Sequence, residues 1–273
     1  MSKMGVKEIL EFVKVEHTLF SLPFILIGAF MAGEPGPVQL FWILVAAVGA
    51  RGLAMGLNRI IDRDIDAANP RTAERHLATG TMSLDTAWRL CGIFLTMLVG
   101  GAWMLNPLCL YLSPIPVAAF VVYPYLKRHT WLCHWWLGVC LALGPAGGWV
   151  AITGEISSLS WCPDLLKVSI GVMLWIAAFD IGYARMDVES DRENGIQSIP
   201  ARFGTGTAGW VTVMCSTLFW HYLFQPISLS ASFVAGILAI LVLFTWNRDD
   251  FQKWWFRTYV AIGWIMFGGL VFL

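Results

Sequence analysis

The sequence has too little charge for an ordinary soluble domain. Asp, Glu, Lys and Arg make up only 13% of its 273 residues, whereas soluble proteins carry roughly a quarter. The 18 basic and 18 acidic residues cancel, so a general attraction to nucleic acid is not expected. A hydrophobic content of 58% and 15 tryptophans instead indicate an integral membrane protein, because indole rings favour the membrane interface.

Cysteine patterns typical of metal sites are also absent. The six cysteines include no C-x-x-C pair, and most of them lie within apolar runs. Structural zinc sites need closely spaced Cys and His ligands. We therefore interpret these cysteines as small buried hydrophobic residues.

Nine apolar runs are long enough to suggest membrane crossings, since a helix spans roughly 30 Å of hydrocarbon with about 20 residues. They cover residues 17–33, 38–60, 84–105, 107–126, 131–153, 165–183, 206–224, 227–246 and 256–273. We predict an all-α integral membrane protein with nine transmembrane helices in one bundle, formed by a single domain over residues 1–273.

The loops between these runs alternate in charge. Lys and Arg gather in the N-terminal segment and in every second loop, whereas loops such as the turn at Gln225 and Pro226 carry none. Short cytoplasmic loops accumulate basic residues. This pattern predicts a cytoplasmic N-terminus, and it also places two sets of aspartates on the cytoplasmic side.

The first aspartate set follows the second apolar run. Asn58, Asp62 and Asp66 lie at four-residue intervals, and Arg51 precedes Asn58 by seven residues, so a continuous helix would carry all four on one face. A cation within a span costs at least a few kcal/mol unless it faces a polar cavity or partner. We expect Arg51 to point inward, either toward an aspartate or toward a bound diphosphate or acidic acceptor.

The second set has the same helical phase. Asp180, Tyr183, Asp187 and Asp191 lie at positions i, i+3, i+7 and i+11, and a single aspartate there would be read as a solvated charge. Two in-phase carboxylate rows repel one another unless a cation joins them. Mg²⁺ binds a few carboxylates together with substrate phosphate, so we hypothesise a metal-dependent membrane enzyme whose two rows face each other.

Basic side chains near these loops are candidates for contacts to the substrate, although each is equally compatible with a simple topology signal. They are Arg71, Arg75, Lys127, Arg128 and Arg192. His17 and His134 are interpreted as satisfied or solvent-facing histidines. Pro145 and its neighbouring glycines interrupt the fifth span, which suits either close helix packing or a tunnel for a lipid tail.

The acidic motifs resemble those of the UbiA superfamily of intramembrane prenyltransferases. Its hallmarks are N-x-x-x-D-x-x-x-D on one cytoplasmic loop and D-x-x-x-D on another, and the resemblance extends over nearly the whole chain. The matching residues here are Asn58, Asp62, Asp66, Asp187 and Asp191. The resemblance implies that these five bind Mg²⁺ and a diphosphate, and that Asp180 and Arg51 lie in the pocket near an acceptor.

Two further segments, 16–24 and 131–134, look most like the 4-hydroxybenzoate polyprenyltransferase branch, which includes the prenyltransferase of the futalosine route to menaquinone. Three departures leave the acceptor open. Arg59 stands where many ubiquinone-type members have Asp, Arg75-His76-Leu77-Ala78 stands where many have R-P-L-P, and Gln197 stands where many have Lys.

The resemblance implies Mg²⁺-dependent transfer of a polyprenyl group from an allylic diphosphate to a 4-hydroxybenzoate-like acceptor or to 6-amino-6-deoxyfutalosine, in respiratory quinone biosynthesis. Expected partners are the polyprenyl diphosphate, the aromatic acceptor and membrane lipid, with no nucleic acid and no obligate protein partner. The expected location is a bacterial-type inner membrane.

Two alternative functions remain open. A cation-coupled secondary transporter also uses carboxylates, but it normally places them near the bilayer midplane. Another intramembrane transferase acting on a diphosphate lipid is the second, although the motif expected of a CDP-alcohol phosphotransferase, with its D-G and A-R elements, is absent.

Overall fold

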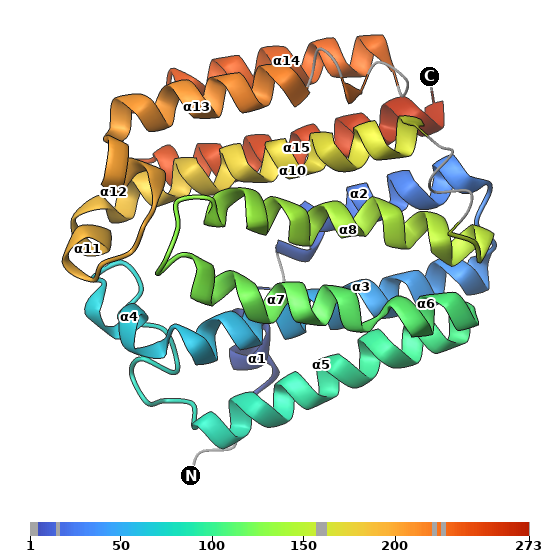
Figure 1. The fold of residues 1–273 in the computed structure, drawn as a ribbon, viewed down its shortest axis with the longest axis horizontal. Coiled ribbons are helices and arrows are strands. Elements are labelled where there is room, and N and C mark those ends of the chain that lie inside the picture. Colours follow the sequence, from blue (N-terminus) through green and yellow to red (C-terminus); the bar gives the residue numbers. More distant parts are fainter. Residues whose placement is uncertain (1–4, 15–16, 157–162, 220–222, 225–227, 273) are drawn as a thin grey trace.

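The computed structural model describes residues 5–14, 17–156, 163–219, 223–224 and 228–272. Glu16, Cys162, Leu273 and the predicted turn at Gln225 and Pro226 lie outside this part of the chain. Within it, every regular element is a helix (Figure 1). The sequence-based expectation of an all-α protein is confirmed.

Most of the helices run back and forth along the long axis of the molecule (Figure 1). In chain order the elements are α1 (Val6–Val13), α2 (Thr18–Ala32), α3 (Pro37–Ile61), α4 (Arg63–Ala68), α5 (Leu84–Leu105), α6 (Pro107–Leu112), α7 (Pro114–Leu126), α8 (Cys133–Thr153), α10 (Pro163–Ala184), η2 (Arg185–Asp187), α11 (Val188–Glu193), α12 (Ile199–Phe203), α13 (Thr205–Leu218), α14 (Leu229–Leu243) and α15 (Phe251–Phe272).

Six helical segments in the described residues are long and apolar enough to cross a membrane, or seven if the bent pair α1 and α2 is counted as one. The predicted number of nine is therefore not confirmed. Three predicted spans correspond to shorter helices, because α2 and α14 have 15 residues and α13 has 14. At 1.5 Å per residue such helices reach only about 22 Å, short of the roughly 30 Å of hydrocarbon.

The predicted fourth span is divided into two helices. α6 ends at Leu112 and α7 begins at Pro114, with Ser113 between them. Proline has no amide hydrogen to continue the α-helical bonds of the preceding helix, and Asn106 starts α6 by accepting a hydrogen bond from Cys109 N. Taken together, residues 107–126 still pass as one candidate span.

α2 and α8 approach each other closely through glycines. A Cβ atom at Gly28 would lie 1.9 Å from the carbonyl oxygen of Pro145, and one at Gly148 would lie 2.1 Å from that of Ile25. α8 itself continues through Pro145 from Cys133 to Thr153. The Pro and Gly residues of this span therefore do not break the helix; they allow backbone contact with its neighbour.

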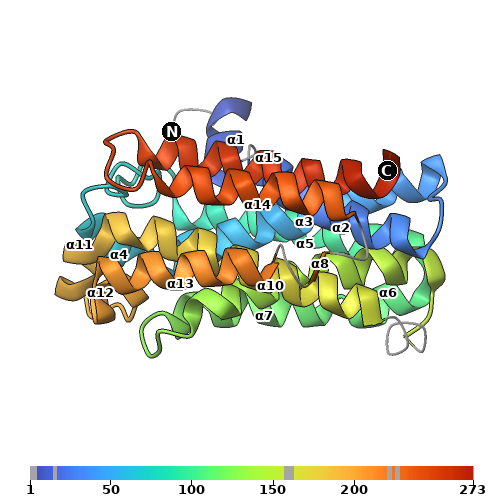
Figure 2. The same ribbon diagram turned by 90° about the horizontal axis from the view of Figure 1, so that it is seen from above.

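Two apolar cores hold the bundle together on either side of α8. One surrounds Trp175, Trp255 and Tyr259 and joins α2, α10, α13, α14 and α15, while the other joins α1, α3, α5 and α7 around Phe12 and Phe94. The short elements α4, α11 and α12 gather at one end of the bundle, and the C-terminal end of α15 lies at the other (Figures 1 and 2). The two aspartate sets are thus brought to the same end.

Candidate functional site

A cavity of about 1020 Å³ receives side chains from both aspartate sets. It also receives side chains from the loop after α4, from the end of α7 and from α8. The predicted site residues that line it are Asn58, Asp66, Arg51, Arg71, Arg75, Lys127, Asp180, Tyr183, Asp187 and Asp191. Both rows therefore contribute side chains to one polar chamber, although Asp62 is not among them.

The first row does not lie on one continuous helix. α3 ends at Ile61, Asp62 is the capping residue with φ −94° and ψ 6°, and α4 begins at Arg63. The backbone bonds of the helix nevertheless continue, since Asp62 N donates to Asn58 O at 2.9 Å and Asp66 N donates to Asp62 O at 2.8 Å. The bend leaves Asn58 and Asp66 on the cavity wall and turns Asp62 away from it.

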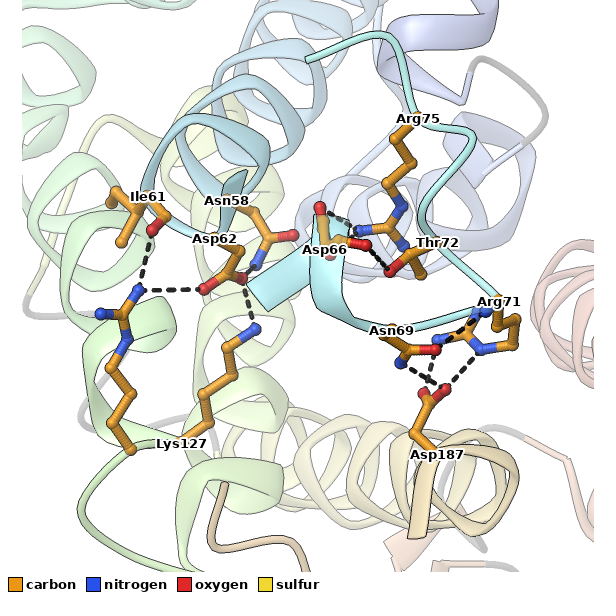
Figure 3. A network of polar contacts seen from close by, with 11 residues as sticks. Asn58, Ile61, Asp62, Asp66, Asn69, Arg71, Thr72, Arg75, Lys127 and Asp187 are labelled. Carbon is orange, nitrogen blue, oxygen red and sulfur yellow. Dashed lines mark hydrogen bonds and ion pairs between the residues drawn. The ribbon is translucent and has the colours of Figure 1, made fainter. Parts of the chain in front are cut away.

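Asp62 is only 1% exposed and is held by the side chains of three residues (Figure 3). Asn58 Nδ2 donates to Asp62 Oδ2 at 2.8 Å, Lys127 Nζ donates to the same oxygen, and Arg128 lies 3.6 Å from Oδ1. Burial raises the pKa of the Asp62 carboxyl, while the charge and hydrogen bond of Lys127 oppose that rise. Oδ1 accepts no hydrogen bond, so this buried oxygen retains capacity for a cation.

Asp66 faces the cavity and forms an ion pair within its own loop. Arg75 donates to both carboxylate oxygens, at 2.8 and 2.7 Å, and Thr72 Oγ1 donates to the Asp66 carbonyl at 2.9 Å. Figure 3 shows how these bonds fold the loop after α4 back over the aspartate. Arg75 therefore lies beside a cavity carboxylate, in reach of an anion bound there.

Asp187 joins the two aspartate sets (Figure 3). Arg71 Nε donates to Asp187 Oδ1 at 2.7 Å, and Asn69 Nδ2 donates to the same oxygen at 2.8 Å. Burial lowers the pKa of the Arg71 guanidinium, but the hydrogen bond and charge of Asp187 outweigh it and raise the pKa overall. The loop that follows the first motif is thus fastened to the second motif by a charge-assisted pair.

The second row passes from an α-helix into a tighter turn. Asp180 and Tyr183 belong to α10, Asp187 ends the 3-10 turn η2, and Asp191 lies on α11. All four nevertheless line the cavity. Ser198, which starts α12, donates to Asp191 Oδ2 at 2.6 Å.

Two of the predicted basic residues lie elsewhere than on the cavity wall. Arg128 donates to Ile61 O at 2.8 Å and so caps the end of α3, while Arg192 Nε donates to Ala201 O at 3.0 Å and holds α12. Each satisfies a carbonyl at a helix end, and Arg128 in addition lies 3.6 Å from Asp62 Oδ1. Contact of Arg128 and Arg192 with substrate therefore stays a prediction.

Three polar residues of the site were not identified from the sequence as substrate or metal ligands. Asn69 bonds to Asp187, Ser198 bonds to Asp191, and His134 bonds through Nδ1 to Asp180 at 2.8 Å. The signal for Ser198 is its place before Ile199 and a proline, which is typical of a helix N-cap. The contacts of Asn69 and His134 join distant segments, so spacing along the chain does not reveal them.

A second, apolar chamber of about 260 Å³ adjoins the polar cavity. The two share Arg51, Ala54, Phe120, Cys140 and Leu141 in their walls. The rest of the apolar wall combines small residues of α3 and α8, among them Ala46, Ala50, Gly144 and Gly147, with larger apolar side chains of α5, α6 and α7. Arg51 therefore marks the boundary between a charged compartment and a hydrocarbon-like one, which is the arrangement an amphiphile with an anionic head requires.

The donor set of the polar cavity suits a hard divalent cation. Its carboxylate and amide oxygens are the ligands that Mg²⁺ prefers. Behind the cavity wall, Asp62 has a buried oxygen that accepts no hydrogen bond from the described residues. In the described residues no three acidic, His or Cys side chains are close enough together to hold a metal ion, because Lys127, Arg71 and Arg75 engage the carboxylates instead. A bound anion that attracts these cations would free the carboxylates for metal.

Comparisons with known protein families and sequences all point to the same family. The model of the UbiA prenyltransferase family matches residues 21–268. The 4-hydroxybenzoate octaprenyltransferase of Alkalilimnicola ehrlichii is 27% identical over 88% of the chain and 82% of its own length, and that of Pseudomonas aeruginosa is 27% identical over 85% and 79%.

Solved structures agree with this match. The apo structure of a UbiA homolog from Aeropyrum pernix K1 superposes with a TM-score of 0.84 and 33% identity, over 94% of this chain and 97% of that one. A UbiA homolog from Archaeoglobus fulgidus, solved with DMAPP and Mg²⁺, has a TM-score of 0.72 and 18% identity, over 97% of this chain and 100% of that one. The latter likeness shows the fold.

Proposed function

Because the chain belongs to the UbiA prenyltransferase family, we propose that it transfers a polyprenyl group from an allylic polyprenyl diphosphate to an aromatic acceptor and releases diphosphate. The observation that carries the proposal is the junction of two compartments. A chamber lined by both aspartate motifs meets an apolar chamber at Arg51. The donor of this reaction has a charged head and a hydrocarbon tail, and each compartment matches one of these parts.

Mg²⁺ and the diphosphate bind in the polar cavity under this proposal. The residues that hold them are Asn58, Asp62, Asp66, Asp187 and Asp191. When bound, Mg²⁺ neutralises the charge that develops on the leaving diphosphate. Asp62 would be able to hold the metal once Lys127 leaves its Oδ2 for the diphosphate, and its Oδ1 accepts no hydrogen bond from the described residues.

The basic side chains of the cavity change partners when the substrate arrives. Lys127, Arg75 and Arg71 each pair with a carboxylate in this structure. A diphosphate presents more negative charge and more acceptor oxygens than a single carboxylate, so these cations move to it. The carboxylates they leave are then available to the metal, which couples binding of the two ligands.

The apolar chamber receives the prenyl chain. Alanines and glycines of α3 and α8 in its wall leave space for a tail that begins at Arg51. An apolar surround also keeps water from an allylic cation, which would otherwise be converted to an alcohol. Such a lipid-soluble donor explains why the site lies within a membrane bundle.

The acceptor is an electron-rich ring of the 4-hydroxybenzoate class, with 6-amino-6-deoxyfutalosine as the other candidate, and the product enters respiratory quinone biosynthesis. Support comes from relatives named 4-hydroxybenzoate octaprenyltransferase. Asp180 and Tyr183 line the cavity on α10, where they contact the acceptor. The ring of Tyr183 packs on Phe179 with centroids 4.6 Å apart, which fixes its position.

We also propose the orientation of the protein. Residues 1–273 form one prenyltransferase domain whose nine crossings place the N-terminus and the cavity on the cytoplasmic side of a bacterial-type inner membrane. The charge alternation of the loops supports this, because Arg71, Arg75, Lys127 and Arg192 all belong to the end that carries α4 and α11. The last residues of α15 lie at the end of the bundle away from α4 and α11, which is consistent with an odd number of crossings (Figure 1).

Mass spectrometry of lipid products tests the proposal. The purified protein is supplied with octaprenyl diphosphate and Mg²⁺, and with either 4-hydroxybenzoate or 6-amino-6-deoxyfutalosine. A prenylated acceptor and an equal amount of diphosphate are expected with one of the two, and EDTA should abolish both. Uptake of an ion or solute into vesicles without diphosphate release would instead favour a transporter.

A further inference from the structure

His134 joins three helices at a buried point beside the polar cavity. It lies on α8 and is 2% exposed. Its Nδ1 is 2.8 Å from Asp180 Oδ2 on α10, and its Nε2 accepts a hydrogen bond from Ile199 N, the first residue of α12, at 3.1 Å. Both ring nitrogens are therefore used by groups on other helices.

The bond from Ile199 assigns the tautomer of the imidazole. A backbone amide can only donate, so Nε2 carries the lone pair and the proton of the neutral ring lies on Nδ1. That N–H then points at Asp180 and donates to a carboxylate. The hydrogen bond from His134 uses Oδ2 of Asp180, and Oδ1 remains for a substrate in the cavity.

The partner of Asp180 differs in kind from those of three other aspartates of the two motifs. Asp62, Asp66 and Asp187 are each paired with Lys or Arg. A fixed cation lowers the proton affinity of a carboxylate strongly, whereas one neutral N–H donor orients it with a smaller loss. Asp191 is also held by a neutral donor, Ser198, but it belongs to the motif proposed to bind the metal, whereas Asp180 lies outside that motif and has a fixed orientation.

We propose that His134 is a positioning residue. It orients Asp180, which accepts the proton released from the prenylated ring, and this inference rests on the proposed prenyl transfer. The C–O bond of the donor breaks and its electron pair leaves with diphosphate. A π electron pair of the ring forms the new C–C bond. The C–H pair at that carbon then returns to the ring, and the proton passes to Asp180 Oδ1.

A kinetic isotope effect tests this assignment. Wild-type protein is assayed with octaprenyl diphosphate, Mg²⁺ and 4-hydroxybenzoate that is either unlabelled or deuterated at both ring carbons next to the hydroxyl. Departure of diphosphate precedes cleavage of the C–H bond, so wild type should show almost no effect of deuterium. In His134→Ala, the loss of orientation makes proton removal slow, and a normal primary isotope effect should emerge.

The variants separate positioning from simple packing. His134→Ala should lower kcat by about 10-fold to 100-fold, as removal of an orienting partner commonly does, and leave KM for the diphosphate unchanged. His134→Asn restores an N–H near the place of Nδ1 and should recover most of kcat. Trp136 lies on α8 like His134 but outside the cavity wall, and its Nε1 donates to Ala119 O on α7. Trp136→Phe, which removes this bond, should behave as wild type.

The results distinguish a failure of the role of His134 from a failure of the proposed prenyl transfer. No product from wild type would overturn both proposals. Product from wild type, together with an unchanged isotope effect in His134→Ala, would overturn the role of His134 alone. If His134→Ala does not fold, the same measurement on Asp180→Asn applies, where a lower kcat with an isotope effect supports the assignment and its absence overturns it.

Discussion

Arg71 and Asp187 are joined by two hydrogen bonds although 116 residues separate them in the chain. The pair connects the loop after the first aspartate motif with the turn that carries the second. Because Arg71 is partly exposed and lines the cavity, an entering anion can compete with Asp187 for it. The pair therefore joins the two motifs in this structure, and the proposed function predicts that Arg71 turns to phosphate when substrate binds.

Substituting Arg71 should impair use of the donor more than folding. In Arg71→Ala we expect kcat/KM for the polyprenyl diphosphate to fall by about 100-fold, the usual cost of losing one donor to a developing anion. Steady-state kinetics of diphosphate release measure this. The control is Arg63→Ala, which removes an exposed pair with Asp64 away from the cavity and should leave the kinetics near those of wild type.

Filling the apolar chamber should change the length of prenyl chain that the protein accepts. Ala50 lies in the chamber wall on α3. Ala50→Phe should lower the ratio of kcat/KM for octaprenyl over geranyl diphosphate by about 10-fold or more, in line with the cost of a pocket that no longer fits. Val48→Phe places the same ring on an exposed side of α3, and an equal change in both variants would argue against a tail in this chamber.

Backbone contact between α2 and α8 should make Gly28 sensitive to a single methyl group. A Cβ there meets the Pro145 carbonyl at 1.9 Å, while a Cβ at Gly92 on α5 meets nothing within 4 Å. Gly28→Ala should lower the free energy of unfolding by about 1–3 kcal/mol through overpacking. Thermal unfolding in detergent provides the measurement. Gly92→Ala carries the same gain in helix propensity, and matching melting temperatures would show that the α2–α8 contact tolerates a side chain.

Regular spacing predicted the part of the site that lies on helices. Asp66 and Asp187 could be assigned to one chamber because each belongs to a set with helical phase, and both line it. Asp62 could not be placed, since the helix bends at this residue and its side chain turns toward Lys127. Helical phase holds only while the backbone remains helical.

Contacts between segments that lie far apart in the chain could not be predicted from the sequence. Nothing in the neighbourhood of Asn69 indicates that its amide bonds to Asp187, and nothing near His134 indicates Asp180. The fold itself creates these pairs. Apolar runs likewise predicted where helices occur but overestimated several lengths, because hydropathy continues through turns such as the one that separates α6 from α7.

The central claim is that both aspartate motifs hold one Mg²⁺-bound diphosphate. The most direct measurement is prenyl transfer by Asp62→Asn and by Asp187→Asn in detergent over a range of Mg²⁺ concentrations, with Asp64→Asn as an exposed control. Each motif variant should lose about 100-fold or more in kcat/KM, because an amide does not replace the charge that holds the metal, while the control retains activity. Near-normal turnover and unchanged Mg²⁺ dependence in both motif variants would contradict the claim.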